Sequence, residues 1–311
     1  MSEEDFPYKW DLNRHSKNPV LSAIPGTWEA TWFVVDDVIR INGKLYMYYS
    51  GSDESSNRKS QLGLALSEDG IIWTRYKGNP IWKLGNWDNF LRDVRVYQFG
   101  GQELWLYYSD GDQHIDLAHS TDGIHWEKSR HNPILEVSQD WEYHVMQESV
   151  LKIDDQWYMW YSTYGGRKPR VTGMATSKDG INWSKHEDNP VLPLGKPGEW
   201  DDYSAFQPYV FYQDGYFHMI YTGSSKEVGT DYACGYALSE DGIHWVKSPD
   251  NPIIGPGPEG AWDAGKVSTH VVWRTGSDTY NIYYNGAPSP GATYVGIGLV
   301  QGQLMKVDGH N

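Results

Sequence analysis

Ser67-Glu-Asp-Gly-Ile-Ile-Trp73 is one of four near-copies of a heptapeptide that decide the fold of this 311-residue chain. The pattern Ser-x-Asp-Gly-Ile-x-Trp returns at Ser120–Trp126, Ser177–Trp183 and Ser239–Trp245, at intervals of 53, 57 and 62 residues. Each copy is followed, six residues after its Trp, by an Asn-Pro pair. A fixed period near this length indicates a repeat architecture.

Two further elements occur five times rather than four. A Trp followed by an acid precedes each of five Tyr-rich runs. The runs are Leu45–Tyr49, Leu104–Tyr108, Trp157–Tyr161, Phe217–Tyr221 and Asn281–Tyr284. The fifth repeat lacks its Asp-Gly segment, whereas Tyr8–Trp10 followed by Asn18-Pro19 resembles the end of a repeat that has no beginning. The chain therefore holds five units, one of which is split between its two ends.

The repeats predict an all-β, five-bladed β-propeller with four antiparallel strands per blade. The strands of a blade are a Val/Ile-rich one, the Tyr-rich one, a Gly-x-Ala-x-Ser one and the Asp-Gly-Ile-x-Trp one. Asp-Gly supplies the positive φ of a tight turn, and Asn-Pro ends the strand. We expect the repeated Trp residues to pack between blades. A single domain is predicted, with residues 1–21 completing blade 5 and blades near 28–82, 87–135, 141–192, 200–254 and 262–300.

Composition excludes several classes of partner. The net charge is −15, from 26 basic and 41 acidic residues, which argues against nucleic acid and anionic membrane surfaces. The one cysteine, Cys234, excludes an internal disulfide and is expected to be a packed core thiol. No segment is long and apolar enough to span a membrane. The acidic start Met1–Asp5 has no apolar run, which predicts a cytoplasmic location, or secretion if a leader has been removed.

In a repeat protein the residues that differ between copies are the candidates for function. The first strand of each blade lines the central channel of a propeller, and there Asp36 and Glu148 both lie twelve residues before an aromatic of the second strand. Asp93 falls at the matching place if the blade 2 hairpin is two residues longer, and blade 5 contributes His270. Three carboxylates therefore point towards one axis. Such acids, flanked by Val, Ile and Leu, need a partner or a function, because burial of an unpaired charge is costly.

These carboxylates suit acid–base chemistry. Acids held close together raise the pKa of one member, which prepares a general acid. Glycoside hydrolysis requires two carboxyl groups, one protonated and one ionised. The alternative is that the acids only accept hydrogen bonds from backbone amides or Tyr hydroxyls inside the channel.

The chain resembles the five-bladed propeller glycoside hydrolases, which include the family 43 arabinofuranosidases and xylosidases and the family 32 fructosidases. Arg92-Asp93 is similar to their Arg-Asp-Pro element, and Glu148-Ser149 occupies the place of their Glu-Cys-Pro or Glu-Gly-Pro element. The Pro after each acid is missing, and the family 32 Asn-Asp-Pro-Asn-Gly motif is absent. Alternation lets only one of Asp36 and Asp37 face the channel, and the match to Glu148 favours Asp36.

The resemblance implies roles for the three catalytic candidates, Asp36, Asp93 and Glu148. Glu148 would protonate the leaving oxygen, Asp36 would activate water or act as nucleophile, and Asp93 would orient Glu148. No cofactor is required, but relatives imply a structural Ca²⁺ in the channel beside His270, the one candidate metal-proximal residue. The candidate substrate-binding residues are Trp32, Phe33, Asp37, Arg92, Gln147, Gln207 and His270. Core packing is the alternative for the first two.

The predicted function is a glycoside hydrolase of the arabinofuranosidase or xylosidase type that acts on an oligo- or polysaccharide. Alternatives are a fructosidase-like retaining hydrolase and a non-catalytic carbohydrate-binding propeller, although the latter should repeat its binding residues in each blade. A sialidase needs an Arg cluster and usually six blades. A phosphorylase needs a cluster of basic residues for phosphate, and the sequence shows none. His114, His144 and His218 have no recognisable metal-binding spacing.

Overall fold

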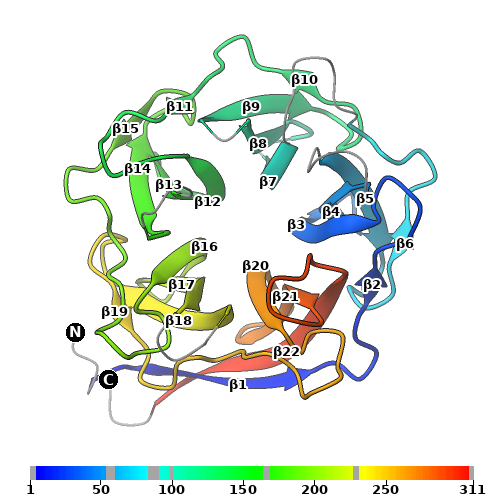
Figure 1. Cartoon of the computed structure of the whole chain (residues 1–311). Helices are drawn as coiled ribbons and strands as arrows, with labels where there is room; N and C mark the ends of the chain where they lie inside the picture. Colours follow the sequence, from blue (N-terminus) through cyan, green and yellow to red (C-terminus); the bar gives the residue numbers. More distant parts are fainter. Residues whose placement is uncertain are drawn as a thin grey trace.

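The computed structural model describes residues 5–53, 60–82, 91–98, 101–111, 113–163, 169–226 and 231–307. Within these residues, 22 strands form five antiparallel sheets arranged around a central axis (Figure 1). The described part contains no helix that could cross a membrane. The predicted five-bladed β-propeller is confirmed.

Each sheet is one blade, and its first strand lies innermost. Blade 1 contains β3 (Thr31–Ile41), β4 (Lys44–Ser52), β5 (Gln61–Ser67) and β6 (Thr74–Arg75). Blade 2 contains β7 (Leu91–Gln98), β8 (Leu104–Asp110), β9 (His114–Ser120), β10 (Glu127–Lys128) and β11 (Leu135–Glu136). Blade 3 contains β12 (Met146–Ile153), β13 (Gln156–Ser162), β14 (Thr172–Ser177) and β15 (Trp183–Lys185). Blade 4 contains β16 (Ser204–Gln213), β17 (Tyr216–Ser224), β18 (Ala233–Ser239) and β19 (Val246–Lys247).

Blade 5 combines the two ends of the chain. It contains β20 (Lys266–Arg274), β21 (Thr279–Ala287) and β22 (Gly296–Lys306), together with β1 (Tyr8–Arg14) and β2 (Leu21–Ser22). β1 runs antiparallel along the outer side of β22, from Tyr8 opposite Lys306 to Arg14 opposite Val300 (Figure 1). The N-terminal segment therefore completes the last blade and closes the ring, as predicted.

The repeated heptapeptide forms a turn rather than a strand. In blade 1, Ser67 Oγ accepts the Gly70 N–H at 2.9 Å, and Asp69 Oδ1 accepts the N–H groups of Ile71 and Ile72, each at 2.9 Å. Gly70 has a φ of 74°. Because the carboxylate occupies these N–H groups, pairing resumes only after Trp73 in blade 1 and at Trp183 in blade 3, and the fourth strand is shorter than the sequence pattern suggested.

The same turns connect neighbouring blades. An aromatic residue of the second strand donates to the Gly carbonyl of the next turn: Tyr48 to Gly123 at 2.8 Å, Tyr107 to Gly180 at 3.0 Å, Trp160 to Gly242 at 2.9 Å and Tyr283 to Gly70 at 2.7 Å. The turn Trp of the next blade packs edge-on against the same aromatic ring. The repeated Trp residues therefore pack between blades, as expected.

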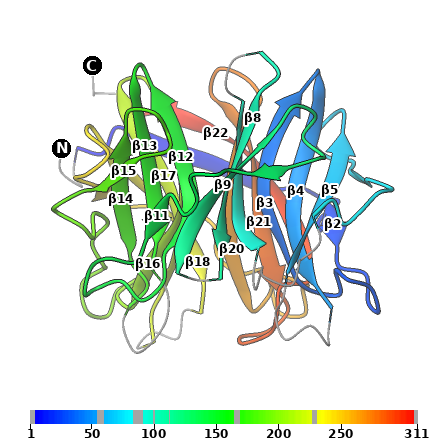
Figure 2. The same cartoon turned by 90° about the horizontal axis from the view of Figure 1, so that it is seen from above.

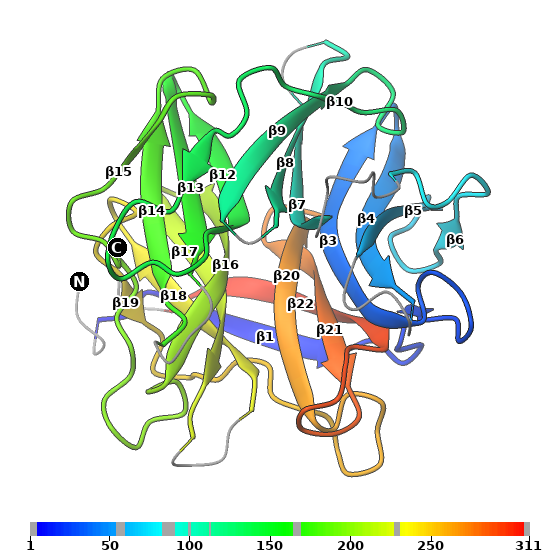
Figure 3. The ribbon, with the colours of Figure 1, turned by 45° about the horizontal axis from the view of Figure 1, so that its top comes forward.

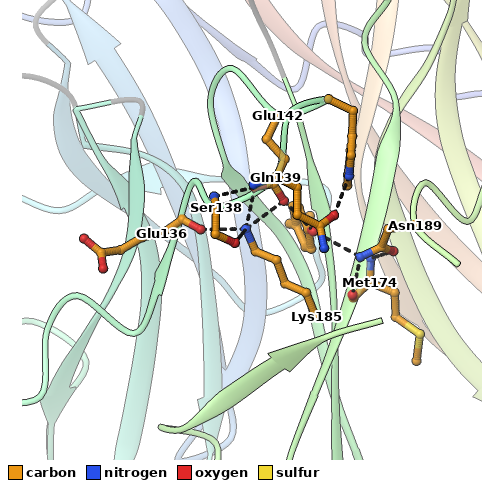
Figure 4. A network of polar contacts seen from close by, with 9 residues as sticks. Glu136, Ser138, Gln139, Glu142, Met174, Lys185 and Asn189 are labelled. Carbon is orange, nitrogen blue, oxygen red and sulfur yellow. Dashed lines mark hydrogen bonds and ion pairs between the residues drawn. The ribbon is translucent and has the colours of Figure 1, made fainter. Parts of the chain in front are cut away.

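The repeated Trp-acid element forms a buried network near the outer strands. In blade 3, Glu142 pairs with Lys185 at 2.6 Å and accepts the Tyr161 hydroxyl at 2.8 Å, while Asn189 donates to that hydroxyl at 3.2 Å (Figure 4). Corresponding ion pairs join Glu29 to Arg75, Asp201 to Lys247 and Asp263 to Arg14. These acids are therefore part of the scaffold.

Candidate active site at one mouth of the channel

Every inner strand carries a β-bulge at the same level. A bulge adds residues that have no partner on the neighbouring strand and changes the direction of their side chains. The bulged residues are Asp36 in β3, Asp93 and Val94 in β7, Glu148 in β12, Gln207 and Pro208 in β16, and His270 in β20. Asp93 and Gln207 each have a φ of 53°. The non-repeated residues singled out from the sequence thus occupy one structurally equivalent position.

The equal spacing of Asp36 and Glu148 from their second strands agrees with this register. Asp36 and Glu148 are equivalent single-residue bulges. In blade 2, one of the two extra residues lies in the hairpin and the other lies in the bulge, which holds Val94 as well as Asp93.

The three carboxyl groups interact at the centre of the ring. Burial raises the pKa of Asp36 to about 8, with Asp93 adding to the effect, although Ser50 Oγ donates to Asp36 at 2.7 Å and opposes it. Burial also raises the pKa of Glu148 well above its usual range, and Asp93 again adds to it. Among the described residues, neither carboxyl oxygen of Glu148 has a hydrogen-bond partner of good geometry, so the nearby Ser162 hydroxyl offsets only part of this effect.

Arg95 is the buried cation of this cluster. Its Nη1 donates to the Asp36 carbonyl and, at 3.0 Å, to the Val94 carbonyl, and its guanidinium lies 5.3 Å from the centre of the Tyr209 ring. Its charge counteracts the rise in the pKa of Asp36, and likewise of Glu148. Arg95 was assigned no role from the sequence. The feature that could have identified Arg95 as a site residue is its position directly after the blade 2 bulge.

Asp37 has a different environment from Asp36. Its carboxylate accepts the backbone N–H groups of Val38 at 2.8 Å and of Val96, in the next blade, at 2.7 Å. Ser149 occupies the equivalent position in blade 3 and accepts the Val210 N–H of the following blade at 3.0 Å. Asp37 therefore ties two blades together, whereas Asp36 belongs to the carboxyl cluster.

A cavity of about 300 Å³ opens at the bulged level and is lined by residues of all five blades. Its wall includes Trp32, Asp93, Arg170, Gln207, Tyr232 and Lys266. Asp36 and Glu148 are 0% exposed, while Asp93 reaches the wall. The structure thus brings the three acids together, but Asp93 is the member that can meet a ligand in this cavity.

Two cations lie on the cavity wall. The sequence showed no cluster of basic residues that could bind phosphate, and the structure corrects this expectation. The Arg170 guanidinium donates to the Tyr232 hydroxyl and lies 5.1 Å from the Phe206 ring centre. The Lys266 ammonium lies 5.2 Å from the Tyr294 ring centre, and among the described residues no carboxylate lies within ion-pair distance of it. Burial lowers the pKa of Lys266, and the charge of Arg170 adds to this while Asp231 opposes it. The two cations were missed because they lie far apart in sequence, outside the repeated motifs.

The loops that carry these side chains are anchored to the next blade. The Arg170 carbonyl accepts the Ala205 N–H at 3.0 Å, and the Tyr232 carbonyl accepts the Val267 N–H at 3.2 Å. The β21–β22 connection, which projects at one end of the ring (Figures 2 and 3), provides Tyr294, whose carbonyl accepts an N–H of β3 at 3.2 Å. The cavity wall is therefore fixed by backbone hydrogen bonds between blades.

The remaining binding candidates divide into two groups. Trp32, with a φ of 49°, lies on the cavity wall with Gln207. Phe33 is fully buried, and its ring centre lies 5.0 Å from that of Tyr49. Gln147 is also fully buried; with its amide oriented to satisfy both groups, it donates to the Asp93 carbonyl at 2.6 Å and accepts the Ser149 N–H at 3.1 Å. Phe33 and Gln147 do not line the cavity.

Arg92 and His270 were also predicted to be site residues, but the structure does not describe their side chains. The channel cation expected beside His270 accordingly stays a prediction. The loops after the second strand of each blade are a further place where binding residues are expected, and of these Glu54, Asp112 and 164–167 also lie outside the described part.

Comparison with known proteins relates this chain to enzymes that act on carbohydrates. A family model described as beta-1,4-mannooligosaccharide phosphorylase matches residues 104–189. A second model, the glycosyl hydrolases family 32 N-terminal domain, matches residues 148–271. The two matches overlap at residues 148–189, in blade 3, where the wall residue Arg170 lies.

Among curated proteins, 1,2-beta-oligomannan phosphorylase of Thermoanaerobacter sp. (strain X514) is 27% identical over 95% of this chain and 99% of its own length. An uncharacterised protein of Mycobacterium tuberculosis (strain CDC 1551 / Oshkosh) is also 27% identical, over 61% of this chain, and the match spans 66% of that relative.

Solved structures share the whole architecture. A glycosyl hydrolase from Bacteroides ovatus superposes with a TM-score of 0.74 at 21% identity, covering 96% of this chain and 95% of that one. The beta-1,2-mannobiose phosphorylase of Listeria innocua superposes with a TM-score of 0.70 at 17% identity, covering 96% and 98%. The chain has the fold of the five-bladed propeller glycoside hydrolases, as its sequence resemblance implied. Its relatives of known activity are carbohydrate-active enzymes.

Proposed function

We propose that this protein is a glycoside phosphorylase that cleaves a β-mannoside with inorganic phosphate. One observation carries the proposal: a carboxyl group, Asp93, and two cations, Arg170 and Lys266, line the same cavity. Two cations held close together, with burial lowering the pKa of Lys266, favour an anionic ligand between them. Arginine is suited to bidentate recognition of phosphate, and lysine adds a point charge.

In this mechanism a proton held by the carboxyl cluster, where Asp36 and Glu148 have raised pKa values, passes through Asp93 to the glycosidic oxygen while a phosphate oxygen attacks the anomeric carbon. The bond between that carbon and the glycosidic oxygen breaks, and a new carbon–oxygen bond to phosphate forms. The products are a sugar 1-phosphate and the shortened saccharide. Attack from the face opposite the leaving group inverts the anomeric configuration, so a β-linked sugar gives an α-1-phosphate.

The burial of the other two acids supports phosphorolysis over hydrolysis. A hydrolase of this type needs a second, ionised carboxylate at the substrate to activate water or form a covalent intermediate. Asp36 is 0% exposed, and its pKa of about 8 keeps it protonated at neutral pH. Phosphate is itself a nucleophile, so one acid and an anion site are sufficient.

The similarities point to the same chemistry and to the sugar. The relative that matches nearly the whole chain is a phosphorylase of 1,2-beta-oligomannan, and one family model describes a phosphorylase of beta-1,4-mannooligosaccharides. Both act on β-mannosides, which favours mannose over the arabinofuranosides and xylosides expected from the sequence resemblance.

Hydrolysis is the second candidate, and the buried cluster of Asp36 and Glu148 behind Asp93 favours it. A shift of the bulged strands that exposed Asp36 would add the missing base. The family 32 match over residues 148–271 supports the same alternative.

A single assay separates the two reactions. The enzyme is incubated with β-1,2- and β-1,4-mannobiose, aryl arabinofuranosides and xylosides, with and without phosphate, and products are identified by ³¹P NMR and sugar analysis. Phosphate-dependent formation of mannose 1-phosphate is the expected result. Release of free sugar at the same rate without phosphate would instead establish a hydrolase.

The role of the cations is tested with a matched pair of lysines. Lys266→Met should raise the KM for phosphate by about 10-fold or more, because it removes a charge-assisted contact. Lys226→Met is the control: Lys226 also lies over a tyrosine ring, that of Tyr203 at 3.8 Å, but it does not line the cavity. Equal effects of the two substitutions would contradict the assignment.

A further inference from the structure

Blade 2 differs from the other blades at a position where they carry glycine. The strand register places Asp116 opposite Tyr108, and the equivalent pairs are Tyr49 with Gly63, Tyr161 with Gly173, Tyr221 with Gly235 and Tyr284 with Gly298. In those blades the tyrosine ring covers the glycine so closely that a Cβ at Gly63 would lie 2.4 Å from Tyr49 Cζ. The scaffold therefore selects glycine at this position, and blade 2 departs from it.

A second departure lies beside the first. Asp110 ends β8 at the position held by Gly51 in blade 1, Gly223 in blade 4 and Gly286 in blade 5. Asp110 pairs in β-register with His114, which is two residues before Asp116 on β9 and on the same face of the strand. One ligand atom from each of Asp110, His114 and Asp116 lies within 4.8 Å of the others.

The buried state of Asp116 is an independent sign of a ligand. Its side chain is only 8% exposed. Oδ2 accepts the Tyr108 hydroxyl at 3.3 Å, but Oδ1 is buried and has no hydrogen-bond partner among the described residues. The His114 Nε2 lies 3.9 Å from Oδ1, too far for a hydrogen bond. A buried carboxylate oxygen without a partner is costly, and a bound cation between it and the imidazole removes that cost.

We propose that Asp110, His114 and Asp116 bind a first-row divalent cation, such as Zn²⁺ or Mn²⁺, between β8 and β9 of blade 2. Two carboxylates and one imidazole form a donor set suited to these ions, with remaining positions open to water because His114 is 33% exposed. Ligands about 2.0–2.2 Å from a cation lie roughly 3–4 Å apart, so small side-chain rotations close the site. Tyr108 orients Asp116 from behind, as an outer hydrogen-bond partner of a metal ligand does.

The site is distinct from the cavity and belongs to the scaffold that supports it. Asp110 pairs with Leu91, two residues before Asp93, so the cation would join β8 to β9 at the mouth end of blade 2. Lys128 lies 3.5 Å from Asp110 Oδ2 and balances part of its charge when no cation is bound.

The test uses titration of the metal-stripped full-length protein with Zn²⁺ and Mn²⁺ by calorimetry, and with Co²⁺ by absorption spectroscopy. We expect one equivalent to bind and to raise the melting temperature. Asp116→Gly restores the residue of the other four blades and should fold, yet weaken binding by about tenfold or more. His114→Gln, which introduces the residue of blade 1 (Gln61), should do the same and is independent of any folding defect in the first variant.

The control is His125→Ala, because His125 is an exposed histidine 2.7 Å from Asp122 on a repeated turn. Its loss should leave the affinity unchanged. Absence of binding to the wild type at 1 mM metal would overturn the proposal, as would equal affinities of the wild type and both ligand variants. The readouts are metal binding and thermal stability, so they stand whether or not the enzyme proves to be a phosphorylase.

Discussion

The two ends of this propeller follow opposite rules. At the Asp-Gly end, four turns use the same residues with the same hydrogen bonds, such as the Gly70 and Gly180 N–H groups bound at 2.9 Å to Ser67 and Ser177. At the mouth, the equivalent bulged position holds Asp in blades 1 and 2, Glu in blade 3, Gln in blade 4 and His in blade 5. Residues that recur from blade to blade therefore build the scaffold, whereas residues that differ between blades build the site.

The strongest test of this comparison is Asp93→Asn, set against Asp69→Asn at the repeated end. Removing the acid on the cavity wall should lower kcat by about 10²–10⁴-fold, because proton donation to the leaving oxygen is lost. The turn variant should keep its kcat and lose stability instead. Steady-state kinetics and thermal melting of both proteins check this, and a fully active Asp93→Asn enzyme would contradict it.

The next largest effect is expected in the buried network of blade 3. Lys185→Met leaves Glu142 charged and 0% exposed at its side chain, which should reduce the free energy of unfolding by about 3–5 kcal/mol. Lys44→Met breaks the exposed pair with Glu68 and should cost less than about 1 kcal/mol. Urea unfolding followed by tryptophan fluorescence measures both. Similar losses in the two variants would refute the structural role assigned to this network.

The pH dependence of stability should distinguish Asp36 from the scaffold acids. Its pKa is raised to about 8 by burial, from an ordinary value of 3.8. Between these values the unfolded chain releases the Asp36 proton while the folded protein retains it, so this group reduces stability as pH rises. In Asp36→Asn the loss of stability between pH 5 and pH 8 should be smaller by about 1–3 kcal/mol. Parallel pH profiles of variant and wild type would show that Asp36 is not buried as a neutral acid.

The smallest predicted effect concerns a single bond between blades. Tyr48→Phe removes the donor to the Gly123 carbonyl and should lower the free energy of unfolding by about 0.5–1.5 kcal/mol without changing activity. Ile220 occupies the equivalent position in blade 4, so Ile220→Val supplies a control in which no hydrogen bond is lost. An activity loss in Tyr48→Phe at unchanged substrate binding would show that the repeated end also affects the site.

The repeats carried enough information to predict the fold, because they fix strand order, turns and ring closure. The inner-strand acids were found by the same logic, since Asp36 and Glu148 keep equal distances to their second strands. The sequence could not predict which of these acids reaches the cavity. Alternation places a residue on one face of a strand, but the bulges decide that Asp93 reaches the cavity while Asp36 lies behind it. Arg170 and Lys266 were missed for a related reason, because the blade 3 loop that carries Arg170 and the start of β20 that carries Lys266 come together only after the ring has closed.

One feature of blade 5 determines how the ring responds to force. Tyr8, at the start of β1, is opposite Lys306, at the end of β22, so the chain enters β1 and leaves β22 at the same end of this strand pair (Figure 1). A pull on the two termini therefore loads the backbone pairs one after another, from Tyr8–Lys306 towards Arg14–Val300, instead of all together. Under tension this ring should unzip at its closing strand, at a lower force than a sheet of the same length loaded in shear.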